Sequence, residues 1–221
     1  MQLINSPADE MFLSVERAMQ PERLQRYMPA AGKDKSTAFK LYLWNCVLCE
    51  AFFISLHFAE IVCRNAIHSR LQSRLGDRWF DNQLLRNILD VRFREELTSA
   101  IANEQTQHGA RFTAHHVVSA LTFAFWQHLM TKRFERLLWS RGVKESFPNA
   151  PNRIERQDVH DAIESVRRWR NRIAHHRAIF DKGPTAKHQE AVNLIHWACL
   201  DTGSWVSSVS RVPTAISIRP T

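Results

Sequence analysis

A helical pattern of about 40 residues, from Ser36 to Leu75, constrains the fold of this chain more than any other feature. Gly76 follows at the position where helices commonly end in a left-handed residue. At a rise of 1.5 Å per residue, ~40 helical residues span roughly 60 Å. Because that length exceeds the size of a compact domain of 221 residues, we expect a bend or a break within the segment.

The most apolar part of this pattern is LYLWNCVLCEAFFISLHFAEIV, residues 41–62. It carries Glu50, His57 and Glu60, and charged groups are costly at the centre of a bilayer. We therefore interpret the segment as a buried helix and not as a membrane span. The first residues, MQLINSPADEMF, lack the basic region and apolar core of a signal peptide, so we expect a cytoplasmic protein.

Further helical patterns follow, and alternating strand patterns are scarce, so the sequence predicts an all-α protein. We divide the chain into an N-terminal helical extension over residues 1–35, a helical domain over 36–203 and a C-terminal tail over 204–221. The last stretch of the tail, SRVPTAISIRPT (210–221), is expected to be loosely attached. The remaining helices are expected at residues 7–20, 21–27 (restarted by Pro21), 84–105, 113–139, 156–176 and 185–200.

The charge balance indicates a polyanionic partner. Lys and Arg number 30 against 22 Asp and Glu, a net charge of +8, and nucleic acid is the simplest such partner. Four cysteines lie in apolar helical segments without zinc-ligand spacing. We expect buried free thiols, in preference to a metal site or a disulfide, at Cys46, Cys49, Cys63 and Cys199.

The segment RWRNRIAHHRAIF, residues 168–180, gathers four arginines and two histidines in a helical pattern. Arg167, Asn171 and His175 share one face of that helix because each lies four residues from the next. Arg170 lies five residues before His175, which is roughly 140° around the helix axis. A straight helix therefore does not bring the two together. The two side chains could meet through a frayed helix end, through the long reach of arginine, or across a second copy of the chain.

These residue types suit the cleavage of RNA by its own 2′-hydroxyl. Histidine titrates near neutrality and acts as base or acid, while arginine clamps phosphate oxygens. Asparagine can orient an imidazole or donate to phosphate. No metal is required, and the segment holds no compact carboxylate set that suits a two-metal nuclease. The alternative interpretation is a solvated helix face with a core histidine.

Three segments resemble one family. Arg170-Asn171-x3-His175 resembles the R-x(4–6)-H signature of the HEPN superfamily, and RNRIAHHRAIF resembles its Abi-like (abortive infection) branch. HFAEIVCRNAIHSRL (57–71) resembles the E-x3-RNAI helix of that branch, and LTFAFWQHL (121–129) resembles its aromatic segment. Their order matches over roughly residues 40–180.

The resemblance implies a HEPN-like helical bundle, here with additional N-terminal helices. It also implies an endoribonuclease that needs no metal or other cofactor, leaves 2′,3′-cyclic phosphate ends, and acts in phage defence or as a toxin. The active site would be composite, formed between two copies in a homodimer, with an antitoxin or a phage signal as regulator. Catalysis would fall to Arg170 and His175 with Asn171; further support is expected from His176, Arg172, Arg167, Glu60, Arg64 and Asn65.

Other interpretations of these residues stay open. Glu60 and Arg64, four apart, suit a simple helix ion pair. Some HEPN toxins carry a tyrosine two residues after the motif histidine, where they are inactivated by nucleotide modification. Arg177 stands there in this chain, so we do not expect that route. The alternative function is a catalytically inactive helical module that binds RNA or a protein. The aromatic side chains expected in the core are Trp44, Phe52, Phe53, Phe58, Phe123, Phe125 and Trp126.

Overall fold

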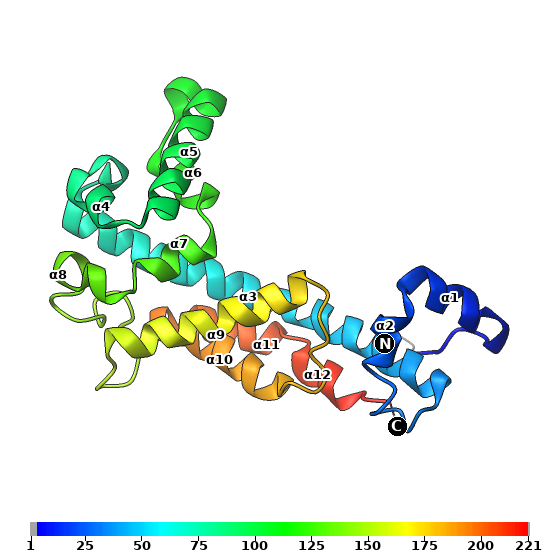
Figure 1. The fold of residues 1–221 in the computed structure, drawn as a ribbon. Helices are drawn as coiled ribbons and strands as arrows, with labels where there is room; N and C mark the ends of the chain where they lie inside the picture. Colours follow the sequence, from blue (N-terminus) through cyan, green and yellow to red (C-terminus); the bar gives the residue numbers. More distant parts are fainter. Residues whose placement is uncertain (1–3, 221) are drawn as a thin grey trace.

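The computed structural model describes residues 4–220, which form helices and turns without any strand (Figure 1). The predicted all-α class is confirmed. The helices are α1 (Phe12–Met19), α2 (Pro21–Gln25), α3 (Lys35–Leu75), α4 (Gln83–Ile88), α5 (Val91–His108), α6 (Ala114–Ala120), α7 (Phe123–His128), α8 (Glu135–Leu138), α9 (Arg156–Ala174), α10 (Pro184–Ala198), α11 (Leu200–Val209) and α12 (Val212–Ser217).

Helix α3 is the spine of the molecule. It runs unbroken for 41 residues, so the break expected as one of two alternatives does not occur. The side chain of Asp34 caps its start by accepting from the amide of Thr37 at 2.7 Å, and Gly76 ends it with a φ of 84°. The length is accommodated because the molecule is elongated: α1 and α2 lie at one end of α3, and α4 to α8 gather at the other (Figure 1).

The C-terminal helices pack along the middle of α3. Helices α9, α10 and α12 all contact it, and the Trp169 ring of α9 meets the Phe52 ring of α3 edge-on at 5.4 Å. The expected loose attachment of the tail is wrong. Its helix α12 buries Val212 and Ala215, and the indole of Trp44 donates to the Ala215 carbonyl at 2.7 Å.

Helices α5 and α6 project from the spine as an arm (Figure 1). The single helices expected over 84–105 and 113–139 are each divided in the structure. At residue 121 the backbone becomes extended, and Thr122 caps α7 by accepting from the amide of Phe125 at 3.3 Å. Glu96 of α5 in turn accepts from the Thr122 hydroxyl at 2.8 Å. This tertiary contact fixes the break.

The N-terminal segment is anchored near the end of α9. Pro21 restarts the helix as predicted. Leu24 and Tyr27 are buried, and the Tyr27 ring stacks on Phe180, the ring that closes the RWRNRIAHHRAIF segment, at 4.9 Å. Residues far apart in sequence therefore meet beside the motif.

Two further expectations concern the burial of the cysteines and the interpretation of the apolar segment as a core helix. All four cysteines are free, but only Cys63 is buried as predicted; Cys49 and Cys199 are partly buried, and Cys46 is exposed. Among residues 4–220, α3 is the one helix long and apolar enough to cross a bilayer, a property that the core helix of a globular protein shares. Its interpretation as a core helix stays a prediction.

Candidate functional site

The motif lies at the carboxyl end of α9. A capping box between Glu155 and Asp158 begins this helix. The apolar side chains recur at helical spacing and face the core, which leaves the basic side chains outward; the buried stripe is Val159, Ile163, Val166 and Trp169. The predicted helix is confirmed, with its end at Ala174 in place of residue 176.

The helix ends within the motif itself. His175 is the C-cap, and the next residue, His176, adopts a φ of 53°. The amide of His176 donates to the Ile173 carbonyl and that of Arg177 to the Arg172 carbonyl, both at 2.9 Å, which closes the last turn. Both histidines are exposed. They lie where the helix dipole favours positive charge.

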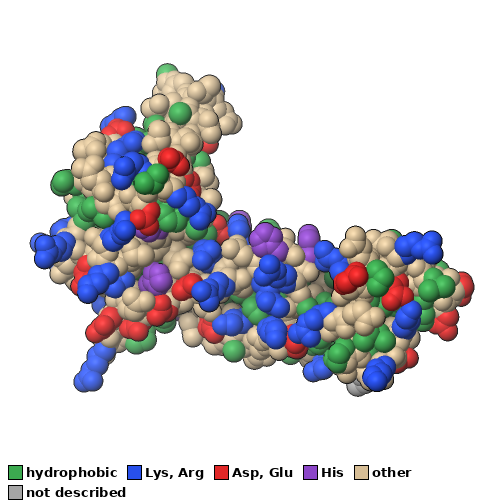
Figure 2. All heavy atoms as spheres, viewed as in Figure 1, with side chains coloured by type: hydrophobic (Ala, Val, Ile, Leu, Met, Phe, Trp, Pro, Cys, Tyr) green, Lys and Arg blue, Asp and Glu red, His purple; other side chains and the backbone are tan. Residues whose placement is uncertain are grey.

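His175 and Asn171 line an open groove of about 740 Å³ between α9 and the start of α10. We call it the basic groove. Lys and Arg side chains gather over this part of α9 on the face shown in Figure 2. Asp161 and Glu164 contribute its acidic groups. The cations along the groove are Arg168, Arg172, Arg177, Lys182 and Lys187.

Most of these cations already have a partner. Arg168 pairs with Glu164 at 2.7 Å, Lys187 pairs with Glu190 at 2.8 Å, and Arg172 donates to a backbone carbonyl at 2.7 Å. Within residues 4–220, the side chains of Arg177 and His175 have no hydrogen-bond or ion-pair partner. These two are the groups free to receive an anion.

Arg170 faces a different direction. Its guanidinium lies 3.4 Å from the Glu60 carboxylate of α3 and donates to the Asn171 side chain at 3.2 Å. Arg170 does not line the basic groove. Within one chain, as the helical spacing predicted, it makes no hydrogen bond to His175.

The expected supporting residues do not all gather at the groove. Arg167 donates to Gln127 of α7 at 2.5 Å and lies outside it, so the polar stripe with Asn171 and His175 divides. Glu60 pairs with Arg170 and not with Arg64, whose buried Nε atom has no partner in the described chain.

Two other predicted residues lie beside different cavities. Asn65 is exposed on α3 and lines a cavity next to Arg70 and Glu145. His176 lines two cavities on the side of the motif that faces α2, together with Arg23. The sequence analysis did not include Lys182 and Lys187, because both lie beyond the end of the motif helix. The turn DKGP (181–184) could have indicated that the chain folds back and brings them to the groove.

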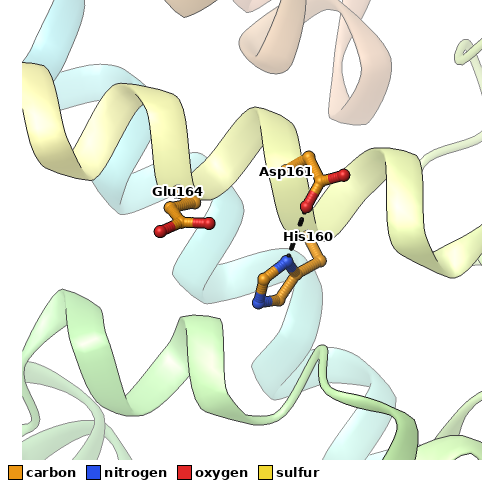
Figure 3. A group of neighbouring side chains, drawn as sticks. All are labelled: His160, Asp161 and Glu164. Carbon is orange, nitrogen blue, oxygen red and sulfur yellow. Dashed lines mark hydrogen bonds and ion pairs between the residues drawn. The ribbon is translucent and has the colours of Figure 1, made fainter.

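A possible cation-binding group also went unforeseen. The ligand atoms of His160, Asp161 and Glu164 on α9 lie within 4.8 Å of one another (Figure 3). His160 bonds to Asp161 at 2.9 Å, which lowers the pKa of that carboxyl, and Glu164 is paired with Arg168. Both carboxylates therefore already have cationic or hydrogen-bonding partners. In the sequence, the spacing of four residues between His160 and Glu164 could have indicated that their side chains share one face of the helix.

The remaining histidines and aromatics serve the fold. His116 caps α6, accepting from the amide of Thr113 at 3.0 Å. His128 stacks on Phe93 at 4.4 Å. The predicted core aromatics are buried or packed on the core except Phe53, which is 68% exposed and stacks on His57.

Comparison of the chain with protein-family models, with curated proteins and with solved structures gives no match.

Proposed function

We propose that this chain is a metal-independent endoribonuclease of the Abi-like HEPN kind, with His175 as its acid–base group. The proposal rests chiefly on one observation: an exposed, unpaired histidine and the unpaired Arg177 stand at a cationic groove. The residue types and their order supply the reaction class through the resemblance. Phosphate-binding cations beside an exposed imidazole suit cleavage of a phosphodiester.

The chemistry needs only the groups of the motif and the RNA. The 2′-oxygen attacks the adjacent phosphorus while His175 takes its proton. The bond from phosphorus to the 5′-oxygen breaks, the 5′-oxygen takes a proton from water, and His175 then releases its own proton to the solvent. The products are a 2′,3′-cyclic phosphate and a 5′-hydroxyl. Arginines beside the phosphorane stabilise its developing charge.

A homodimer is part of the proposal because Arg170 and His175 do not meet within one chain. We place Arg170 of one copy against the phosphate held at His175 of the other. Glu60 then orients Arg170 through their ion pair. The exposed Phe53 and its stacked neighbour His57 lie on the same helix as Glu60 and offer apolar surface to a second copy. A cytoplasmic role in phage defence or as a toxin, held in check by an antitoxin or phage signal, belongs to the same proposal.

The Arg170–Glu60 pair also favours a second candidate. If Arg170 stays with Glu60, the groove lacks the arginine that the resemblance assigns to catalysis. The chain would then be a helical module that holds RNA without cutting it.

A gel assay with a mixed RNA pool tests the two candidates. The wild type is compared with His175→Ala and Arg170→Ala, each with folding checked by circular dichroism. We expect both variants to lose at least about 100-fold in cleavage rate, the usual scale for acid–base and charge-stabilising groups. Arg141→Ala, an exposed arginine away from the groove, is the charge-matched control and should cut normally. Intact RNA retained by all four proteins would favour the binding module.

A further inference from the structure

A second hollow lies on the other side of the motif from the basic groove. It has a volume of about 430 Å³, within the range of about 300–1,000 Å³ that is typical of small-molecule sites. Tyr27, Tyr42 and Asn45 line it, Cys46 and Cys49 complete its α3 wall, and Arg23 and His176 stand beside them. We call it the tyrosine cleft.

The walls of the tyrosine cleft are held by three parts of the chain. Tyr27 stacks on Phe180 at 4.9 Å and meets Tyr42 edge-on at 5.3 Å. The Asn45 side-chain oxygen accepts from the amides of Ile179 at 2.7 Å and Phe180 at 3.2 Å. The loop after the motif is therefore fastened to α3, and the cleft is preformed.

Tyr27 carries an unused polar group into this cleft. The residue is only 3% exposed, yet within residues 4–220 its hydroxyl makes no hydrogen bond. Burial, with Cys46 and Tyr42 close by, raises the pKa of this phenol, so the hydroxyl stays protonated and able to donate. Because no protein group occupies this hydroxyl, a ligand in the cleft can accept a hydrogen bond from it.

Unpaired cations stand next to the cleft. An adjoining hollow of about 260 Å³ shares Arg23, Tyr27, Tyr42 and His176 with it and adds Arg177. Arg23 is exposed and makes only a long contact of 3.5 Å to the His176 carbonyl, and Arg177 has no side-chain partner in the described chain. Aromatic walls with an inward hydroxyl suit a nucleobase, and two free arginines suit a phosphate.

We propose that the tyrosine cleft binds one nucleotide, with its base against Tyr42 and the Tyr27 hydroxyl and its phosphate on Arg23 and Arg177. Arg177 lines both the basic groove and the hollow beside the cleft, so the two lie next to each other at the end of α9. The nucleotide is accordingly a residue of the RNA strand, next to the phosphate at His175. This assignment rests on the proposed function. In this arrangement the Tyr27 hydroxyl helps to determine which base the cleft prefers. A free mononucleotide would be recognised by the same groups, so the experiment must distinguish it from an RNA strand.

Cys46 provides a direct readout because it is exposed and lines the cleft. Maleimide labelling of the whole protein, mapped by mass spectrometry, gives its rate with AMP, GMP, CMP, UMP, inorganic phosphate or a 2′-O-methyl RNA that cannot be cleaved. At ligand about ten times its Kd, mass action leaves about one cleft in ten open, so labelling should slow about ten-fold. Cys199, far from the cleft in sequence and not among its lining residues, is the internal reference and should label at an unchanged rate.

Two variants tie protection to the assigned groups. Tyr27→Phe keeps the ring and removes the hydroxyl, and it should change the order of preference among bases. Arg23→Ala, at an exposed position, should weaken protection by every nucleotide alike. Inorganic phosphate alone should leave Cys46 reactive, because it does not fill the aromatic part.

The outcomes separate this assignment from the proposed function. Protection by the 2′-O-methyl RNA supports the cleft even if natural RNA is never cut. Protection by mononucleotides but not by RNA overturns the strand path and assigns the cleft to a free nucleotide. Cleavage of RNA with no protection of Cys46 by any probe overturns the cleft and leaves the ribonuclease standing.

Discussion

Within the described residues 4–220, His175 and Arg177 differ from the other basic residues of the groove because their side chains have no hydrogen-bond or ion-pair partner. Arg168 and Lys187 are each paired with a glutamate. Exposed ion pairs of this kind contribute little free energy, and their arginines and lysines remain available mainly to steer a polyanion. The chemistry proposed for the groove therefore depends on two unpaired side chains at the end of one helix.

Three histidines, of which His68 and His128 are buried and His188 is partly buried, give the stability of the fold a definite pH dependence. Burial lowers the pKa of His68, His128 and His188 below the ordinary value for histidine. Below about pH 6.5 the unfolded chain therefore binds protons that the folded chain does not. The free energy of unfolding should fall as the pH drops from 7.5 to 5.5, as measured by urea denaturation.

His68 allows this pH dependence to be tested at one residue. It accepts from the Trp79 indole at 3.1 Å, and its other ring nitrogen is buried without a partner in the described chain. His68→Gln keeps an acceptor but cannot titrate, so its unfolding free energy should depend less steeply on pH than that of the wild type. Equal slopes for the two proteins would show that His68 does not contribute.

At the scale of elements, the end of α9 is the feature that presents the motif. His176 takes the left-handed conformation that glycine adopts most easily. His176→Gly should be more stable than His176→Ala by about 1 kcal/mol, because alanine keeps the steric cost of that backbone conformation. Thermal or urea unfolding of the two variants provides the comparison. A more stable alanine variant would contradict the assigned helix end.

Periodicity and capping signals were enough to predict the elements that carry the motif. The run from Ser36 to Leu75 and the stripe from Val159 to Trp169 contain their own helical spacing, and Gly76 marks an end. The expected break in α3 was wrong because it assumed a compact shape, and shape depends on how the other helices are distributed along the spine.

Contacts between distant segments could not be predicted from the sequence. The break before α7 depends on Glu96 accepting from Thr122, 26 residues away. Tyr27 meets Phe180 across more than half of the chain, so nothing local identified the tyrosine cleft. The sequence placed Arg170 and His175 on different sides of a helix, and the structure agrees. The ion pair of Arg170 with Glu60 could not be predicted, because it depends on the packing of α3 beside α9.

At the scale of the whole molecule, the proposed composite site can be tested by complementation. If Arg170 of one copy serves His175 of the other, a mixture of Arg170→Ala and His175→Ala chains forms heterodimers with one intact site. With random exchange, roughly half of the dimers are mixed and each has one working site of two, so roughly a quarter of wild-type activity should return.

The same mixture also tests the alternative, in which Arg170 does not act on the site of the other copy. Each variant alone must be inactive, and sedimentation must show dimers, for the comparison to hold. Two inactive variants that form mixed dimers and recover no activity would rule out the action of Arg170 across the dimer, while leaving the role of His175 to be tested separately.

The measurement that tests the central claim most directly is the identity of the RNA ends formed in excess EDTA. Wild-type protein, His175→Ala and Glu164→Gln are incubated with RNA, and the fragments are analysed by mass spectrometry. The proposed function predicts 2′,3′-cyclic phosphate ends from the wild type and from Glu164→Gln, and none from His175→Ala. Fragments that vanish with EDTA, or that persist unchanged in His175→Ala, would contradict it.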